Sequence, residues 1–427
     1  MTLGTVRGGN LVSASGSAAG GWSRLGGIDI LRGIAILFVL LNHVNMRLFL
    51  AKIPYAEGWP HQLVSSLVWN GQYGVQIFFA VSGFLITSVS FRRWGSLARI
   101  GARDFYALRF ARIAPLLIVL LLALALLHFT HSEWFFVPPD KGGLGGALLA
   151  ALTFHINLLE ARKGYLPANW DVLWSLSVEE VFYLVFPIAC LLLGRGRLLV
   201  IFLAVLVIAG PFARTVLAGQ NETWKEYSYL GGMDAIALGC LTAILESRVR
   251  LSHRVRLGAQ ALGIALMILV LGFSTTLEET ALMRAGLDMT VLALGTCLLM
   301  LALAQGNSSV PALARPLVWL GRRSYEVYLI HMFVVIGAFV AFTEYGKPPA
   351  GVPILFVTAI LISAFMGELV GRFYSEPMNR ILRRRMTGTS NIDGAFLFDA
   401  GAIDRDASEG DQQAGCGSRN VFPGGAA

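Results

Sequence analysis

Long runs of apolar residues, separated by short polar stretches, dominate the pattern along this chain. Crossing the apolar layer of a membrane takes about 20 helical residues. Ten runs approach or exceed that length, at residues 29–50, 73–91, 110–130, 175–193, 197–213, 229–246, 257–273, 286–304, 325–345 and 352–373. The pattern predicts an all-α fold, a polytopic membrane helix bundle of about ten transmembrane helices.

An eleventh, weaker run at 144–160 is interrupted by His155 and Asn157. Lys and Arg accumulate in cytoplasmic loops, so their distribution indicates whether this run crosses the membrane. With ten spans and a cytoplasmic N-terminus, 22 Lys and Arg residues lie inside and 9 outside, whereas an eleventh span changes this to 14 inside and 17 outside. We therefore expect ten spans, both termini in the cytoplasm, and 144–160 as a re-entrant or outer-surface segment.

The composition agrees with a membrane protein. The residues AVILMFWYC make up 56% of the chain and charged residues 14%, whereas soluble domains carry about 25% charged residues. A soluble enzyme, a nucleic-acid binder and a disulfide-stapled secreted domain are excluded, and basic cytoplasmic loops explain the net charge of +8. Cys190, Cys240 and Cys297 lie in apolar runs without metal-ligand spacing, so we expect buried thiols and no metal site, with Cys416 as a free thiol in a tail.

The chain divides into three parts by composition. Residues 1–25 are rich in Gly, Ser and Ala, which predicts a flexible cytoplasmic N-terminus. Residues 26–386 form the transmembrane domain. Residues 387–427 lack apolar runs and are rich in Gly, Asp, Ser and Ala, which predicts a disordered cytoplasmic tail.

The first predicted span carries three ionisable residues, which are costly inside a membrane and are therefore candidates for function. Asp29 and Arg32 lie three residues apart, so they share a helix face and can pair, either as an anchor at the cytoplasmic end or as part of a site. His43 lies on the same face, roughly 16 Å further along the helix axis. A buried histidine can be a structural group, but an imidazole in this position can also act as a general base.

Two further clusters of charge lie at span ends. Arg109 and Arg112 occupy one face at the cytoplasmic mouth of a span. They are either topology signals or a site for the phosphates of a cytoplasmic cosubstrate, because arginine binds phosphate well. Glu179 and Glu180 begin an apolar helix, so at least one should face the bundle interior or water.

Aromatic and small residues complete the candidate set. Trp170 and Trp174 are explained either by the membrane interface or by stacking on a sugar ring. Gly74, Ser82 and Gly83 suit close helix packing. Tyr328 and His331 share a helix face, and for His331 a structural hydrogen bond and a contact in a donor pocket are both open.

Taken in order, five stretches resemble the membrane-bound acyltransferase family 3, bacterial O-acyltransferases of surface polysaccharides and related glycans. They are the Arg32-to-His43 spacing, FFAVSGF at 78–84, RFAR at 109–112, WSLSVE at 174–179 and SYEVYLIH at 324–331. The tripeptide at 375–377 resembles the end of the family's core. The resemblance covers residues 24–385. The larger members add an extracytoplasmic esterase-like domain that takes part in delivery to the acceptor. From the resemblance we expect this chain to depart from them by lacking one.

The resemblance implies a multi-pass protein of the bacterial cell (inner) membrane that transfers an acyl group, usually acetyl, from a cytoplasmic acyl-CoA to a hydroxyl of a carbohydrate acceptor. The acceptor is a polysaccharide, a lipopolysaccharide or a lipid-linked oligosaccharide. In this reading acetyl-CoA, or another acyl-CoA, is the cosubstrate, and no metal is expected. His43 would be the general base or a transient acyl carrier.

The other candidate residues take supporting roles in this reading. Glu179 would orient or recharge His43, and Asp29 and Arg32 would set its electrostatic field. Donor-binding residues would be Arg109, Arg112, Tyr328 and His331. A transporter or flippase of a lipid-linked sugar, using a His/Glu proton relay, remains the alternative. A non-enzymatic component of a polysaccharide assembly complex is a third, weaker possibility.

Overall fold

A computed structural model describes residues 19–217, 219, 221–277, 280–306 and 310–387. The first described helix, α1, begins at Ala19, within the segment predicted to precede the first span. Residues 1–18 and the predicted tail from 388 onward lie outside the described residues, and so does Cys416. The other three cysteines are buried, as expected.

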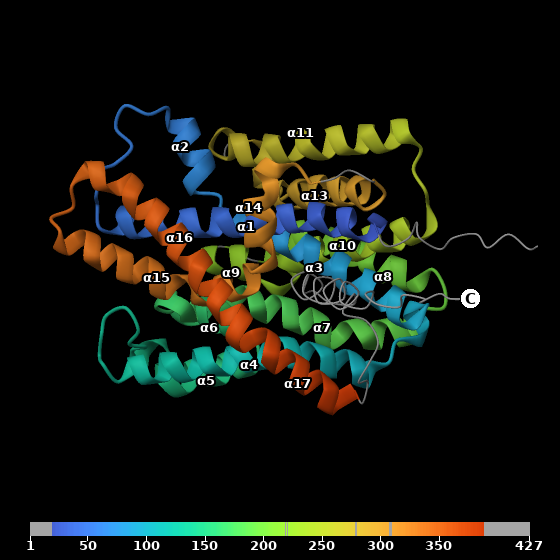
Figure 1. Cartoon of the computed structure of the whole chain (residues 1–427), viewed down its shortest axis with the longest axis horizontal. Coiled ribbons are helices and arrows are strands. Elements are labelled where there is room, and N and C mark those ends of the chain that lie inside the picture. The colour runs from blue at the N-terminus through green and yellow to red at the C-terminus, as the bar shows by residue number, and fades with distance from the viewer. Residues whose placement is uncertain (1–18, 218, 220, 278–279, 307–309, 388–427) are drawn as a thin grey trace, which may run out of the picture.

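Ten helices coincide with the ten predicted spans (Figure 1). They are α1 (Ala19–Leu50), α3 (Gly71–Trp94), α4 (Ala102–His128), α7 (Leu173–Leu193), α8 (Leu198–Phe212), α10 (Tyr229–Arg248), α11 (His253–Leu277), α13 (Asp288–Ala304), α15 (Ser324–Glu344) and α16 (Val352–Val370). Within the described chain, nine helical segments are long and apolar enough to cross a membrane, and α13, with 17 residues, lies just below that length. The prediction of an all-helical, multi-pass membrane protein is confirmed.

The weak eleventh run is broken into two short helices, neither of which is long enough to span. α5 (Gly143–Leu152) has 10 residues and α6 (Ile156–Lys163) has 8. Between them Phe154 adopts a left-handed backbone with φ of 56°. Because a β-carbon makes that conformation costly inside a helix, the chain turns there instead of continuing. This agrees with ten spans.

The remaining helices are short and lie outside these ten. They are α2 (His61–Val68), α9 (Glu222–Tyr227), α12 (Ala281–Arg284), α14 (Arg315–Arg322) and α17 (Glu376–Thr387), with 3-10 turns at Leu97–Arg99, Pro139–Lys141, Ala168–Trp170, Ala312–Ala314 and Pro349–Gly351 and π-helical turns at Ala213–Leu217 and Gly371–Ser375.

Large aliphatic side chains fill the centre of the bundle and also cover its outside. Ile36, Ile77 and Ile236, on α1, α3 and α10, are fully buried. By contrast, Leu192 and Ile208 are 75% and 73% exposed. Exposed leucine and isoleucine on long helices are expected where the surrounding solvent is lipid.

Glycines allow the central helices to approach closely. A Cβ added to Gly83 would overlap the backbone carbonyl oxygen of Ile236, and one added to Gly239 would overlap that of Ala80. The predicted packing role of Gly83 is therefore confirmed, with α10 as the partner helix. This contact fixes α3, which carries Ser82, against the middle of the bundle.

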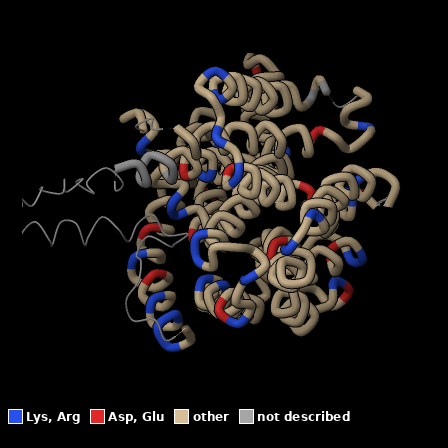
Figure 2. Tube along the Cα trace, turned by 90° about the vertical axis from the view of Figure 1, so that its right-hand side faces the viewer, with Lys and Arg blue, Asp and Glu red and all other residues tan. Residues whose placement is uncertain are grey.

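Both described ends of the chain lie at the same end of the bundle, as an even number of spans requires (Figure 1). Figure 2 looks onto that end, where Lys and Arg mark several helix ends and turns. The basic residues of α17 are Arg380, Arg383, Arg384 and Arg385. The cytoplasmic orientation of this end stays a prediction, and it is called the predicted cytoplasmic end below.

Candidate active site

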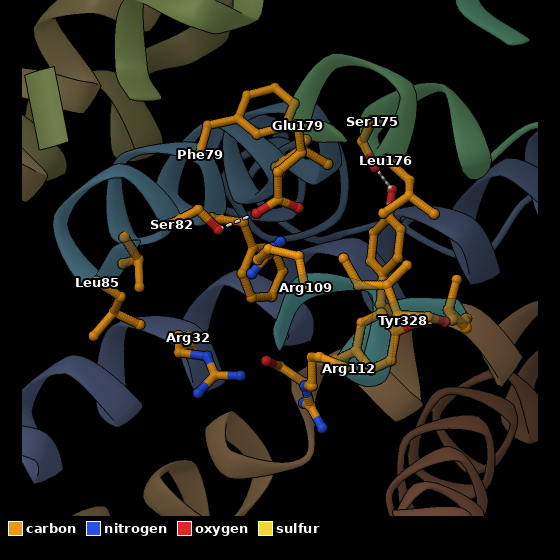
Figure 3. A pocket seen from close by; sticks show the side chains of 17 residues that line it. Arg32, Phe79, Ser82, Leu85, Arg109, Arg112, Ser175, Leu176, Glu179 and Tyr328 are labelled. Atoms are coloured by element: carbon orange, nitrogen blue, oxygen red, sulfur yellow. Dashed lines mark hydrogen bonds between the residues drawn. The ribbon is translucent and has the colours of Figure 1, made fainter. Parts of the chain in front are cut away.

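A cavity of about 110 Å³ lies inside the bundle, between α1, α3, α4, α7 and α15. Five of the predicted site residues line it: Arg32, Arg109, Arg112, Glu179 and Tyr328. Figure 3 shows Arg32, Arg109 and Arg112 around one space, with Glu179 and Ser82 on its far side. The cavity is large enough for several water molecules, each of which needs about 10–15 Å³.

The carboxylate of Glu179 is held by two hydroxyl groups. Ser82 on α3 donates a hydrogen bond to it, and Tyr183, one turn further along α7, donates another at 2.6 Å. The neighbouring Glu180 is also directed inward, because it is 8% exposed and pairs with Arg109. Both acids therefore lie in the bundle, and Ser82, which the sequence explained only by packing, belongs to the site.

The two arginines of α4 are held by acidic and aromatic partners. Arg109 lies 3.0 Å from Glu180, and Arg112 lies 3.1 Å from Glu326 on α15. The guanidinium of Arg109 also stacks over the ring of Tyr183, with its central carbon 3.8 Å from the ring centroid. These pairs fix the orientation of both guanidinium groups, since little solvent reaches them.

Asp29 and Arg32 pair as their spacing predicted, at 3.4 Å. The second carboxylate oxygen of Asp29 accepts from Arg322, also at 3.4 Å. Arg322 belongs to α14, which packs on α1 so closely that a Cβ at Gly321 would overlap the carbonyl oxygen of Asp29. Asp29 thus positions Arg32 at the cavity wall but does not line the cavity itself.

His43 and His331 are in direct contact, with Nδ1 of His43 3.3 Å from Nε2 of His331. Nδ1 of His331 lies 2.6 Å from the carbonyl oxygen of Tyr328, and Nδ1 of His43 lies 2.9 Å from that of Val39. A carbonyl oxygen only accepts hydrogen bonds, so each Nδ1 carries a proton. The single Nδ1 proton of His43 is then shared between the carbonyl oxygen of Val39 and Nε2 of His331, and Nε2 of His43 carries a lone pair with no hydrogen-bond donor among the described residues.

Tyr328 connects this histidine pair to the cavity. Its ring lines the cavity and its carbonyl accepts the proton of His331. Its hydroxyl is fixed by Ser175 at 2.6 Å and by the carbonyl of Val172 at 3.0 Å. Tyr328 therefore links the lining of the cavity to His331.

A separate polar cluster lies around the N-terminal end of α7. Trp174 is 4% exposed and stacks on Tyr227, with ring centroids 4.1 Å apart. Trp170 is fully buried, so neither tryptophan lies at the lipid surface. Burial and the adjacent carboxylate of Asp171 raise the pKa of Glu160 on α6 well above its ordinary value.

Comparison with models of known protein families shows which family the chain belongs to. Residues 25–368 match the model of the acyltransferase 3 family, described as an acyltransferase domain. This stretch contains the cavity and the histidine pair. The chain belongs to the acyltransferase 3 family.

Curated relatives of this acyltransferase domain include YrhL of Bacillus subtilis, which is 27% identical over 82% of this chain and 54% of its own length. The peptidoglycan O-acetyltransferase OatA of Listeria monocytogenes is 26% identical over 83% of this chain and 55% of its own. The O-acetyltransferase OatA of Staphylococcus aureus is 25% identical over 83% of this chain and 57% of its own length. The chain thus spans about half the length of the curated relatives it matches. No solved structure matches it.

Within the acyltransferase domain, the predicted site residues form two groups. Arg32, Arg109, Arg112, Glu179 and Tyr328 meet at the cavity, with Asp29 behind Arg32. His43 and His331 meet each other beyond Tyr328. No hydrogen bond joins Glu179 to His43 among the described residues, and His331 occupies the position next to His43 that was predicted for Glu179.

Proposed function

We propose that this protein transfers an acyl group, most simply acetyl, from a cytoplasmic acyl-CoA to a hydroxyl of a cell-wall or surface glycan. The observation that carries the proposal is the oriented His43–His331 pair beside a cavity that three arginines line within the membrane-spanning bundle. Two of the relatives named above are O-acetyltransferases, one of them named for peptidoglycan, so a peptidoglycan hydroxyl is the first acceptor to test.

The proposed reaction uses the free lone pair on Nε2 of His43. This nitrogen takes the proton of the acceptor hydroxyl while the hydroxyl oxygen attacks the thioester carbonyl. The carbon–sulfur bond then breaks, and the departing sulfur takes the proton from His43, which gives an ester and free CoA. His331 accepts from Nδ1 of His43 and so orients the imidazolium formed in between, as a neutral acceptor in the position that a carboxylate takes in serine-protease triads.

The positive charge at the cavity fits the same reaction. Attack on a thioester places negative charge on its carbonyl oxygen, and fixed guanidinium groups stabilise such charge where little water is present. The carboxylate partners of all three arginines, Asp29, Glu180 and Glu326, lie outside the cavity lining, so each guanidinium group can present its charge to the cavity. An acyl group carried transiently on Nε2 of His43 is the second route for the same residues.

The test is an acyl-transfer assay on the full chain in lipid nanodiscs, with labelled acetyl-CoA and soluble peptidoglycan fragments. We expect release of CoA and a mass increase of the glycan that require His43. The matched control is His61→Ala, which removes an exposed histidine from α2.

Acetyl-CoA turnover in His43→Ala at the rate of the His61→Ala control would overturn the role of His43. A wild-type protein that never turns over acyl-CoA would favour the transporter instead, because a transporter does not consume the thioester. An acyl-enzyme trapped without acceptor would identify the second route.

A further inference from the structure

A second cavity, of about 40 Å³, lies at the predicted cytoplasmic end between α3, α4 and α17. Arg109 and Arg112 line this cavity as well as the larger one. The two guanidinium groups therefore stand between the two cavities. A molecule entering from the predicted cytoplasmic end would reach the small cavity first and the large cavity only after passing these arginines.

Most of the surface that lines the small cavity is apolar, although six polar or charged residues border it, and one polar group there lacks a partner among the described residues. Asn379 on α17 is 3% exposed, and its amide oxygen has no hydrogen-bond donor among the described residues. Leaving a buried acceptor unpaired costs about 1–3 kcal/mol. A narrow apolar space with one buried acceptor suits a flexible chain that carries an amide N–H.

Two further arginines line the small cavity from opposite sides. Arg93 comes from the end of α3 and Arg383 from α17. The partner of Arg93, Asp104, lies 3.6 Å away with a side chain that is 42% exposed. By contrast, the carboxylates that hold Arg109 and Arg112 have side chains only 10% and 1% exposed. A phosphate would therefore displace a weak, solvated partner at Arg93 but a buried one at Arg109 or Arg112.

We propose that the small cavity holds one amide-bearing segment of the pantetheine arm of the acyl-CoA donor, with the donor's phosphates on Arg93 and Arg383 and the amide of that segment donating to Asn379. The thioester end passes between Arg109 and Arg112 into the large cavity. This inference rests on the proposed function and moves phosphate recognition from Arg109 and Arg112 to the outer pair of arginines. It also gives α17 a direct part in donor binding.

Binding of two ligands to the full chain separates the parts of this site. The ligands are CoA and adenosine 3′,5′-bisphosphate, which has phosphates but no pantetheine arm. Calorimetry in nanodiscs of zwitterionic lipid removes competition from anionic headgroups. Arg383→Gln and Arg93→Gln should weaken both ligands by roughly ten- to a hundredfold, because each removes a charged contact to phosphate. Asn379→Leu should weaken CoA alone.

The matched control is Arg384→Gln, which neutralises the next residue of α17, an exposed one. It should bind CoA as the wild type does. Equal CoA affinity in Arg93→Gln, Arg383→Gln and Arg384→Gln, with acyl-CoA still consumed, would overturn this inference and leave the proposed function standing. Equal CoA affinity in these variants, together with loss of their binding to anionic vesicles, would instead mean that α17 binds lipid headgroups. A wild type that neither binds CoA nor turns over acyl-CoA would overturn both proposals.

Discussion

At the scale of single residues, the geometry around His43 fixes which of its nitrogens is available for chemistry. Val39 and His331 both accept from Nδ1, so the ring is held with Nε2 directed away from them. An imidazole fixed in this way needs little reorganisation when it takes a proton. His331 then acts as a positioning residue, whose effect is transmitted through His43.

Substitution of the two histidines should separate these roles. His43→Ala should slow acyl transfer by about 10² to 10⁴, the usual cost of losing a general base. His331→Ala should slow it by about 10- to 100-fold, as for other residues that orient a catalytic group. His331→Gln should restore part of the rate, because its amide oxygen can accept from Nδ1 of His43. The rate of acyl transfer per membrane-inserted protein measures all three, and an unaffected rate in His331→Ala would contradict the assignment.

Removing Arg112 should destabilise the fold, which the sequence alone did not indicate. Its partner Glu326 is 1% exposed, and the second carboxylate oxygen of Glu326 has no partner among the described residues. Arg112→Ala would leave a buried charge unpaired, which typically costs about 3–5 kcal/mol. Thermal unfolding of purified protein should show a marked loss of stability, and adding Glu326→Gln should recover much of it. If Arg112→Ala unfolds at the wild-type temperature, the ion pair contributes no stability.

At the scale of helices, close contact between α3 and α10 depends on two glycines, Gly83 and Gly239, each of which faces a carbonyl oxygen of the other helix. Any larger residue there must push the helices apart, because the atom it meets is a main-chain carbonyl oxygen. Ser82 lies next to Gly83, so such a displacement would also move the hydroxyl that holds Glu179. Packing and site geometry are therefore coupled along α3.

Gly239→Val tests this coupling. A valine would overlap the carbonyl oxygen of Ala80, so we expect a large loss of folded protein, of the size of other overpacked cores, about 1–3 kcal/mol or more. Gly337→Val on α15 is the control, because nothing lies within 4 Å of a Cβ there. Size-exclusion chromatography in detergent gives the folded fraction. Equal folded fractions for the two variants would mean that α3 and α10 can separate without cost.

The helices could be predicted from the sequence, but their contacts could not. The apolar runs coincide with ten long helices, nine of which among the described residues are long and apolar enough to span, because a lipid environment requires sufficient length and apolar character of each helix separately. The partners of the arginines lie 71 and 214 residues away, and the two histidines are 288 residues apart. Such pairs depend on how each helix is rotated about its axis, which spacing within one helix does not determine. Among these contacts, only the Asp29–Arg32 pair could be predicted from the sequence, because its two residues lie one turn apart on the same helix.

At the scale of the whole molecule, ten spans place residue 250 and residue 280 on opposite sides of the membrane. A variant lacking Cys416 and carrying either Arg250→Cys or Thr280→Cys can be labelled in intact cells with a membrane-impermeant maleimide. We expect the Thr280→Cys variant to react from outside, and the Arg250→Cys variant to react only after permeabilisation. The reverse pattern would invert the predicted orientation, and labelling of both variants from outside would contradict ten spans.

The two guanidinium groups that separate the cavities also have an electrical consequence. A membrane protein that admits one molecule from each side must not conduct ions, since each elementary charge crossing a potential of 100 mV dissipates about 2.3 kcal/mol. Fixed positive charge in a narrow passage repels protons and metal cations, as it does in water channels. Arg109 and Arg112 stand at that passage, each held by a carboxylate. Under the proposed function, in which donor and acceptor arrive from opposite sides, these two guanidinium groups place a barrier to cations between the two cavities.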